Sequence, residues 1–311
     1  MPSSKPLASW CERFAGGDGN SAKGADAVVY VWVNGELVEE TQARVSVFDH
    51  GLTTGDGVFE TIKIVDGHPF ALTRHLARLR QSANGLGLPE LDLDELRDAT
   101  QAVVRANPQV GPGRLRITVT GGTAPLGSDR GGSDPNVMLA VQPMGQPAPS
   151  SDVVIVPWCR NERGPLVGLK TTSYADNVLA LSYARERGAA EAIFANTMGN
   201  LCEGTGTNVF LVRDGRLVTP PLSAGCLAGV TRGLVVEWVG EEQPAGLARV
   251  DETDMAVQEL VRAEEAFLVS TGRDVQPIRA VDGHVLSVIP GLVTKAVREL
   301  FARRATQCWD P

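Results

Sequence analysis

The run from Gly168 to Phe210, GLKTTSYADNVLALSYARERGAAEAIFANTMGNLCEGTGTNVF, is the most informative part of this 311-residue sequence. Its apolar and small residues predict a helix from Ala175 to Arg187. Lys170 precedes this helix, and Glu203 lies on a later strand. We interpret Lys170 as an amine that condenses with an aldehyde, because partial burial lowers a lysine pKa and frees a neutral, nucleophilic fraction. We interpret Glu203 as the carboxylate that keeps the ring of that aldehyde protonated.

The overall composition limits the possible partners. Hydrophobic residues make up 43% and charged residues 21%, which is usual for a globular enzyme with one large or two medium domains. The net charge of −8 argues against nucleic acid, because phosphate binding needs a basic surface. No apolar run of about 18 residues and no signal-peptide pattern occurs, so we expect no membrane span. Five scattered cysteines without CxxC spacing predict neither a disulfide framework nor a metal site, and they favour a cytoplasmic location.

Changes of pattern along the chain predict four parts. Residues 1–27 are rich in Ser, Gly and Ala and predict a partly ordered N-terminal extension. Residues 28–143 contain hairpin signals and two helical patterns, the first with Thr73 as a candidate cap, and predict a small α/β domain. The polar, Pro-rich run 144–151 predicts a linker, and residues 152–311 predict a larger domain.

Several motifs follow one another in an order typical of one enzyme family. They are VNGELV (33–38), FDHGLTTGDGVFET (48–61), LTRHLARL (72–79), GLKTTSY (168–174), LCEGTGTNVFLV (201–212), LAGVTR (227–232) and VSTGRDVQPIRAVDG (269–283). Over about residues 30–300 the sequence resembles the fold-type IV pyridoxal-phosphate enzymes, also called class IV aminotransferases. Among these it looks most like 4-amino-4-deoxychorismate lyase-like members. The resemblance implies a two-domain α/β fold, pyridoxal 5'-phosphate in the cleft between the domains, and a homodimer.

The resemblance also implies roles for individual residues. Lys170 looks like the Schiff-base lysine, Glu203 like the partner of the pyridine nitrogen, and Tyr174 like the donor to the ring oxygen of the cofactor. Arg74 looks like the phosphate-binding arginine. The remaining phosphate contacts would be the backbone amides of Val230 and Thr231 and the hydroxyls of Thr271 and Ser270.

Elementary chemistry supports part of this assignment without the family. Gly229-Val230-Thr231 predicts a helix N-terminus, where free N–H groups and the helix dipole favour a phosphate. Each residue also has an ordinary alternative. A helical Arg such as Arg74 is usually a surface charge, and Tyr174 would fit a core position with its hydroxyl at the edge. Only the joint occurrence of the motifs favours the functional interpretation.

The expected substrate is a small amine that carries a carboxylate. A lyase that expels pyruvate from aminodeoxychorismate to give 4-aminobenzoate, a folate precursor, is our first expectation. The alternative is an amino-acid aminotransferase of branched-chain type. A D-amino-acid type is less favoured, because no Arg-x-His motif occurs in the region GGTAPLGSDRGG (121–132). Arg116 and Arg130 are candidates to bind a substrate carboxylate. A non-catalytic binding protein of the same fold is the remaining alternative.

Overall fold

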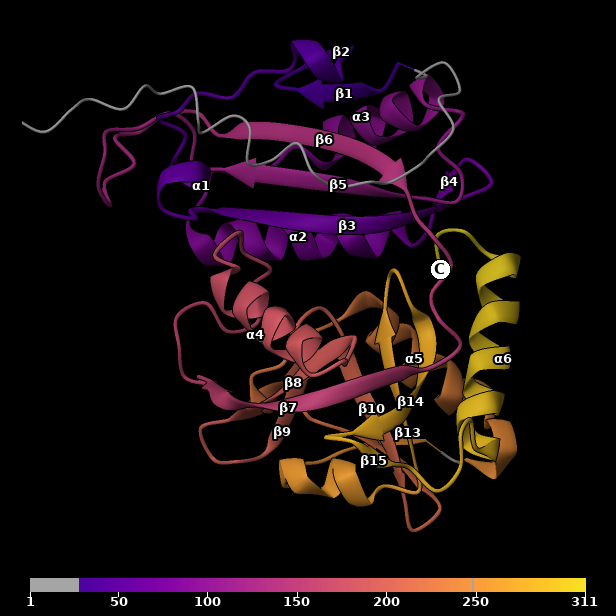
Figure 1. The fold of residues 1–311 in the computed structure, drawn as a ribbon. Coiled ribbons are helices and arrows are strands. Elements are labelled where there is room, and N and C mark those ends of the chain that lie inside the picture. Colours follow the sequence, from indigo (N-terminus) through magenta and orange to yellow (C-terminus); the bar gives the residue numbers. More distant parts are fainter. Residues whose placement is uncertain (1–27, 248) are drawn as a thin grey trace, which may run out of the picture.

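The computed structural model describes residues 28–247 and 249–311, so the extension predicted over residues 1–27 lies outside the described part. Within this part the chain forms two sheets, one after the other in sequence (Figure 1). Neighbouring strands of the first sheet run antiparallel, in the order β2-β1-β6-β5-β3-β4. They are β1 (Tyr30–Val33), β2 (Glu36–Glu39), β3 (Gly57–Val65), β4 (His68–Pro69), β5 (Gly113–Thr120) and β6 (Asn136–Pro143).

One face of the first sheet packs on the helices α2 (Leu72–Leu86) and α3 (Leu93–Ala106). Because side chains alternate along a strand, Leu115 and Ile117 of β5 are buried against these helices, while Arg114 and Arg116 are exposed on the other face. Helix α3 has the predicted bounds and is capped by Asp92, which accepts hydrogen bonds from two backbone amides of the first turn.

The second sheet is mixed and has the order β12-β11-β10-β13-β14-β7-β8-β9, with β15 paired to β14. The pairs β14–β7, β7–β8 and β11–β12 are parallel, and the other neighbours are antiparallel. Its strands are β7 (Ser151–Arg160), β8 (Glu191–Asn196), β9 (Leu201–Gly204), β10 (Asn208–Arg213), β11 (Arg216–Thr219), β12 (Val250–Glu252), β13 (Glu265–Ser270), β14 (Asp274–Val281) and β15 (His284–Val285).

The second sheet packs against the helices α4, α5 and α6. Helix α4 (Ala175–Glu186) follows the predicted span closely and packs its alanines on β7 and β8. Helices α5 (Val230–Glu242) and α6 (Leu292–Gln307) form another core with β10 and β13. The segment 144–150 joins the two sheets, where the sequence predicts a linker. None of the helices within the described residues is long and apolar enough to cross a membrane.

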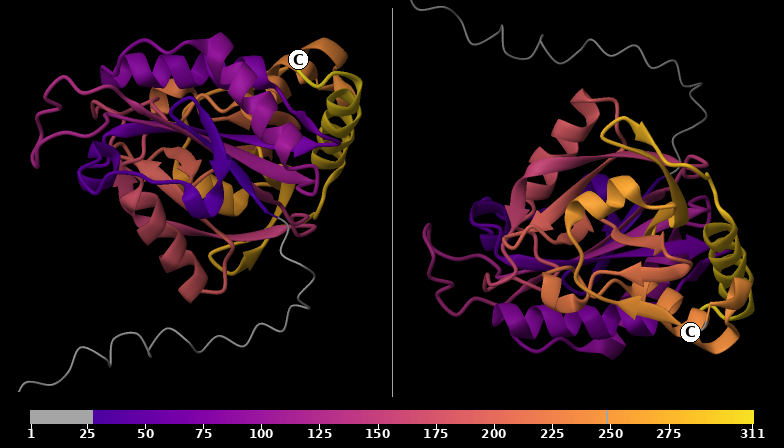
Figure 2. Two further views of the ribbon diagram at one scale, coloured as in Figure 1. Left: turned by 90° about the horizontal axis from the view of Figure 1, so that it is seen from above. Right: turned by 90° about the horizontal axis from the view of Figure 1, so that it is seen from below.

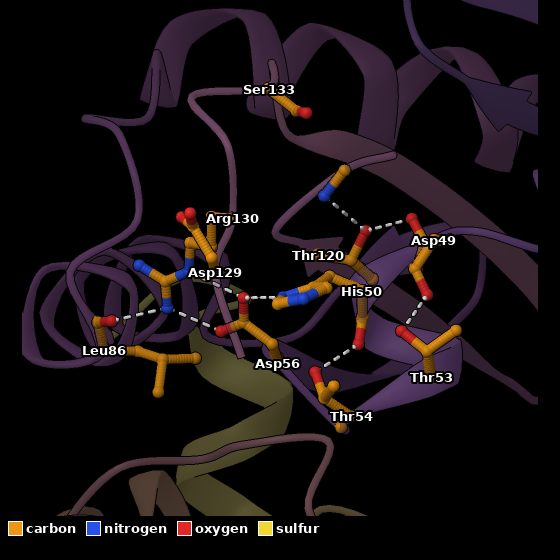
Figure 3. A network of polar contacts seen from close by, with 12 residues as sticks. Asp49, His50, Thr53, Thr54, Asp56, Leu86, Thr120, Asp129, Arg130 and Ser133 are labelled. Atoms are coloured by element: carbon orange, nitrogen blue, oxygen red, sulfur yellow. Dashed lines mark hydrogen bonds and ion pairs between the residues drawn. The ribbon is translucent and has the colours of Figure 1, made fainter. Parts of the chain in front are cut away.

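The long loop between β5 and β6, residues 121–135, is fastened to the first sheet by a polar network (Figure 3). Arg130 donates to both carboxylate oxygens of Asp56, at 2.6 and 2.5 Å, and to the backbone carbonyls of Leu86 and Gly87. His50, in the short helix α1 (His50–Thr53), contacts Asp56 through Nδ1 at 3.0 Å and the Gly127 carbonyl through Nε2 at 2.9 Å. Since both ring nitrogens face acceptors, this geometry favours the doubly protonated imidazolium.

Candidate active site

A cavity of about 940 Å³ lies where residues of both sheets face one another. The first sheet contributes Phe59, Thr61, Arg114 and Arg116, and helix α2 contributes Arg78. The segment 164–177 and the second sheet provide much of the remaining wall. The structure brings seven of the eight predicted site residues to this cavity: Lys170, Tyr174, Glu203, Val230, Thr231, Ser270 and Thr271.

Lys170 is held in place by its backbone. Its carbonyl accepts a hydrogen bond from the Phe59 amide at 2.9 Å, and its own amide donates to the Ser82 hydroxyl of α2 at 3.1 Å. The Lys170 Nζ lies 4.4 Å from the centre of the Phe59 ring. Burial lowers the pKa of this amine to about 8, and nearby Arg78 acts in the same direction. Near neutral pH this amine therefore has a larger neutral, nucleophilic fraction than an ordinary lysine, as nucleophilic attack requires.

Glu203 faces the same cavity from β9. One of its oxygens accepts a hydrogen bond from the Leu227 amide at 2.8 Å, and the other lies 3.4 Å from Arg160 Nε. Burial raises the pKa of Glu203, although Arg160 opposes this effect. A carboxylate with a raised proton affinity is suited to share a proton with an aromatic ring nitrogen. Arg160 is a cavity residue that the sequence analysis missed.

Tyr174 precedes α4 and lines the cavity beside Lys170. Its ring packs edge-on against Phe59, with 5.3 Å between ring centres, and its hydroxyl donates to the Thr205 carbonyl at 2.8 Å. Burial raises the Tyr174 pKa, so the phenol stays neutral. In this arrangement the phenol contacts the loop after β9 and also borders the cavity.

The end of the cavity at which α5 begins is suited to bind an anion, and we call it the anion-binding end. Gly229 is the N-cap residue of α5, and Val230 and Thr231 supply the first two amides of the helix. A Cβ at position 229 would lie 2.1 Å from Asn208 Oδ1, so only glycine allows this close approach. Ser270 ends β13 and Thr271 follows it at the same cavity. Free N–H groups, hydroxyls and a helix dipole make this end suitable for a phosphate.

The structure does not place Arg74 at the predicted phosphate site. Its guanidinium donates to Glu237 at 2.9 Å and to the Pro311 carbonyl, and Arg74 does not line the cavity among the described residues. Arg78, one helical turn further along α2, does line it and donates to the Ala228 carbonyl at 3.0 Å, directly before the α5 N-terminus. A signal was available in the sequence. At 3.6 residues per turn, Arg74 points away from the Leu72, Leu76 and Leu79 stripe, whereas Arg78 lies nearer its flank.

Arg78 is fixed by a buried carboxylate. It forms a two-point contact with Glu60 of β3, and Glu60 also contacts His75 Nδ1 at 2.6 Å. Burial alone would raise the pKa of Glu60, but the charges of Arg78 and His75 outweigh it and hold this pKa well below its usual range. Burial lowers the pKa of His75. Glu60 therefore holds the Arg78 side chain in a fixed position next to the anion-binding end of the cavity.

Arg116 lines the cavity and packs on the same aromatic ring as Lys170. Its guanidinium carbon lies 3.5 Å from the centre of the Phe59 ring, the same ring that Lys170 Nζ approaches. Within the described part of the chain neither Arg116 nor Arg114 has an acidic partner. Guanidinium groups that line the cavity without an acidic partner are suited to bind a carboxylate. Arg130, the other candidate, is instead committed to Asp56.

Comparisons with known proteins show the family to which the chain belongs. Residues 57–281 match the model of the amino-transferase class IV family. The branched-chain-amino-acid aminotransferase of Salmonella typhimurium is 32% identical over 287 residues, covering 88% of this chain and 91% of the relative. A branched-chain aminotransferase structure from Thermoproteus uzoniensis superposes with a TM-score of 0.83 at 33% identity, covering 89% of this chain and 94% of that chain.

The comparisons do not support our first expectation of a lyase. A Legionella pneumophila structure named "Putative 4-amino-4-deoxychorismate lyase" superposes with a TM-score of 0.79, covering 85% of this chain and 96% of that chain, but at 22% identity it shows the fold alone. The relatives above 30% identity named here are aminotransferases, which fits the alternative better. The chain belongs to the class IV aminotransferase family, a family of two-domain enzymes that use pyridoxal 5'-phosphate.

Proposed function

We propose that this enzyme transfers the amino group between an α-amino acid and a 2-oxo acid, with branched-chain amino acids as the donor class. The observation that carries the proposal is the position of Arg116 and Lys170 around one aromatic ring. The Arg116 guanidinium carbon and the Lys170 Nζ lie 3.5 and 4.4 Å from the centre of the Phe59 ring. An α-amino acid needs a cation for its carboxylate close to the group that handles its α-carbon.

The cofactor is assigned to the cavity by the chemistry of its wall. Lys170 would hold the aldehyde carbon, and Glu203 would accept the hydrogen bond of the ring nitrogen. Tyr174 would lie beside the ring oxygen. Arg78, the α5 N-terminus at Val230 and Thr231, and the hydroxyls of Ser270 and Thr271 would hold the phosphate. When bound, pyridoxal 5'-phosphate supplies an electron sink for the bonds at the substrate α-carbon.

The protein itself contributes proton handling and orientation. The Lys170 amine, with its pKa lowered to about 8 by burial, can accept the proton of the substrate α-carbon at neutral pH. Glu203 and Arg78 would fix the two ends of the bound ring. Arg116 would hold the carboxylate so that the α-carbon faces Lys170. In enzymes generally, orientation of this kind lowers the activation free energy by up to about 7–11 kcal/mol.

The apolar part of the cavity wall fits an apolar substrate side chain. Phe59, Leu166 and Val167 are among the residues that line the cavity. Burial of a branched aliphatic side chain against such a wall stabilises binding by about 1.5–3 kcal/mol. This lining, and the names of the Salmonella typhimurium and Thermoproteus uzoniensis relatives, support a branched-chain donor over a polar one.

We propose in addition that the enzyme is a homodimer through the end of the molecule at which α1, α4 and the 121–135 loop lie (Figure 1). Large apolar side chains are exposed there, among them Val47 and Leu52 at 71% and 68%, and Leu126 at 73%. Val178 and Leu179 of α4 are also more than 60% exposed. Exposed apolar side chains gathered at one end of a protein mark an interaction surface. Light scattering should give the mass of two chains, and Leu52→Asp should shift it towards one.

The function is tested with a panel of amino donors and two acceptors. The purified protein is reconstituted with pyridoxal 5'-phosphate and supplied with L-leucine, L-isoleucine, D-alanine or L-lysine, each with 2-oxoglutarate or pyruvate. We expect the highest kcat/KM for the branched-chain L-amino acids. Lys170→Ala is the control and should lose both turnover and the visible absorption of the lysine-bound cofactor. Higher turnover with D-alanine or L-lysine would refute the donor assignment.

The lyase is tested separately with aminodeoxychorismate and no oxo acid. Catalytic release of pyruvate and 4-aminobenzoate under these conditions would overturn the aminotransferase proposal. The same experiment addresses the non-catalytic alternative, because a binding protein would turn over neither substrate set.

A further inference from the structure

Helix α2 begins without a capping side chain of its own. The N-cap position is taken by Ala71, whose methyl group cannot accept a hydrogen bond from the first turn. Ala71 is also left-handed, with φ of 54°, a conformation that is unfavourable for a residue with a Cβ atom. Thr73, the cap predicted from the sequence, lies inside the first turn instead. The start of α2 therefore needs support from elsewhere in the chain.

The support comes from the last three residues of the sequence, Trp309–Pro311, which we call the tail. Asp310 accepts hydrogen bonds from the Thr73 amide at 2.8 Å and from the Thr73 hydroxyl at 2.5 Å. The Trp309 carbonyl accepts from the amide of the left-handed Ala71 at 2.6 Å. Asp310 thus occupies the role of an N-cap side chain, although it lies 237 residues away in sequence.

Further contacts hold the tail against the first sheet and its helices. The Trp309 ring stacks on His68 of β4, with 5.3 Å between ring centres and 17° between ring planes. Arg97 of α3 lies 3.6 Å from Asp310, and Arg74 donates to the Pro311 carbonyl at 2.8 Å. The tail follows α6, which packs on the second sheet, so it connects the two halves of the molecule (Figure 2).

Helix α2 touches the active site at two points. Arg78 lines the cavity and donates to the Ala228 carbonyl before the α5 N-terminus. The Ser82 hydroxyl accepts a hydrogen bond from the Lys170 amide at 3.1 Å. A shift at the start of α2 would move Arg78 more than the Lys170 backbone, because Arg78 lies four residues closer than Ser82 to this end of the helix. Leu72, the first residue of α2, lies six residues, about 1.7 turns, before Arg78.

We propose that Asp310 is a positioning residue for the cofactor site, because it caps α2 across the domain boundary and so holds Arg78 against the phosphate end of the cavity. The inference rests on the phosphate role of Arg78 in the proposed function. Asp310 itself does not line the cavity among the described residues and acts only through α2.

The test compares Asp310→Ala with Asp310→Asn, because asparagine caps a helix about as well as aspartate and alanine does not. The matched control is Glu299→Ala, an exposed acid on α6 that lies before the tail. In the cofactor-free protein, Asp310→Ala should speed hydrogen exchange of the first-turn amides of α2 roughly fivefold, the usual effect of a lost cap. Asp310→Asn and Glu299→Ala should leave this exchange near the wild-type rate.

The second readout separates positioning from general stability. Dissociation constants are measured for pyridoxal 5'-phosphate and for pyridoxal, which lacks the phosphate. Asp310→Ala should weaken binding of the phosphorylated form roughly three- to tenfold and leave pyridoxal unchanged, with recovery in Asp310→Asn. Equal weakening of both ligands, or of neither, would overturn the proposal.

Arg78→Ala identifies which assumption fails. This variant should lose discrimination between the two ligands. If Arg78→Ala keeps the discrimination, the phosphate role in the proposed function is wrong. If Arg78→Ala loses it and Asp310→Ala does not, the role of Asp310 is wrong and the site assignment stands.

Discussion

Glu60 and Arg78 form a two-point contact in the protein interior, with Arg78 Nε 2.7 Å from Glu60 Oε1 and Nη2 2.8 Å from Oε2. Glu60 is fully buried, and Arg78 has only 10% of its side chain exposed. The contact joins β3 of the first sheet to α2 and directs the remaining guanidinium nitrogen towards the carbonyl that precedes α5. The anion-binding end of the cavity is therefore built from both halves of the molecule.

Glu60→Gln should destabilise the protein strongly. The variant leaves Arg78 with a neutral partner inside the protein, and breaking a buried ion pair costs about 3–5 kcal/mol. Urea unfolding of the cofactor-free variant measures the change in free energy of unfolding. A loss below about 1 kcal/mol would show that solvent reaches this pair and that the support of Arg78 is weaker than the geometry indicates.

Arg74 and Arg78 form a matched pair of variants on one helix. Arg78→Ala should weaken binding of pyridoxal 5'-phosphate roughly 10- to 100-fold, because a hydrogen bond to a charged group contributes about 1.5–3 kcal/mol. Arg74→Ala removes a surface ion pair worth about 0–1 kcal/mol and should change this affinity less than threefold. Fluorescence titration with the cofactor measures both. The opposite order of effects would restore the role first predicted for Arg74.

Arg116→Lys should separate substrate binding from cofactor binding. Lysine keeps the positive charge but loses the planar, two-point contact with a carboxylate and the stacking on Phe59. We expect kcat/KM for L-leucine to fall about 10- to 100-fold, while the affinity for pyridoxal 5'-phosphate stays within threefold of wild type. Steady-state kinetics and cofactor titration provide the two numbers. An unchanged kcat/KM would place the carboxylate on another group, with Arg114 as the next candidate.

The reactivity of Lys170 in the cofactor-free protein should rise with pH around a midpoint near 8. Burial favours the neutral amine and lowers the Lys170 pKa from 10.5 to about 8. Limited acylation at a series of pH values, followed by mass spectrometry of the peptides, gives the rate at Lys170. Lys295, exposed on α6, is an internal reference in the same sample. A Lys170 midpoint above about 10 would mean that the amine is solvated and not activated by burial.

His50 should make stability depend on pH above neutrality. The hydrogen bond to Asp56 raises the His50 pKa, and the Gly127 carbonyl adds to this effect, while burial and Arg130 oppose it. A raised folded-state pKa gives stability that is full below the unfolded value of about 6.5 and is lost as pH rises through the folded value. Asp56, whose pKa is lowered by Arg130, loses its contribution only in acid.

The measurement for His50 is urea unfolding of wild type and His50→Gln between pH 6 and pH 9. The difference between the two proteins should be largest at pH 6 and shrink towards pH 9. Hydrogen exchange near Gly127 should rise over the same range, since the imidazolium donates to that carbonyl. A difference that is constant with pH would mean that His50 stays neutral and only fills space.

Local sequence patterns determined much of the architecture. The helices over Leu93–Ala106 and from Ala175, the alternation along β5 and the polar segment after β6 follow from short-range periodicity and turn chemistry. The family motifs placed Lys170 and Glu203 in one site, and both line the same cavity. These features depend on residues within a few positions of one another, so the sequence alone contains them.

Only the tertiary structure decided which side chains meet across the chain. Helical periodicity separates the faces on which Arg74 and Arg78 lie, but only the contacts of Arg78 with Glu60 of β3 and with the carbonyl before α5 show which arginine reaches the anion-binding end. In the same way, Asp310 and not Thr73 caps α2. Arg116 became the candidate to bind the carboxylate because it packs on the same Phe59 ring as Lys170. The physical reason is that such contacts depend on the packing of two sheets, whose relative placement no local pattern encodes.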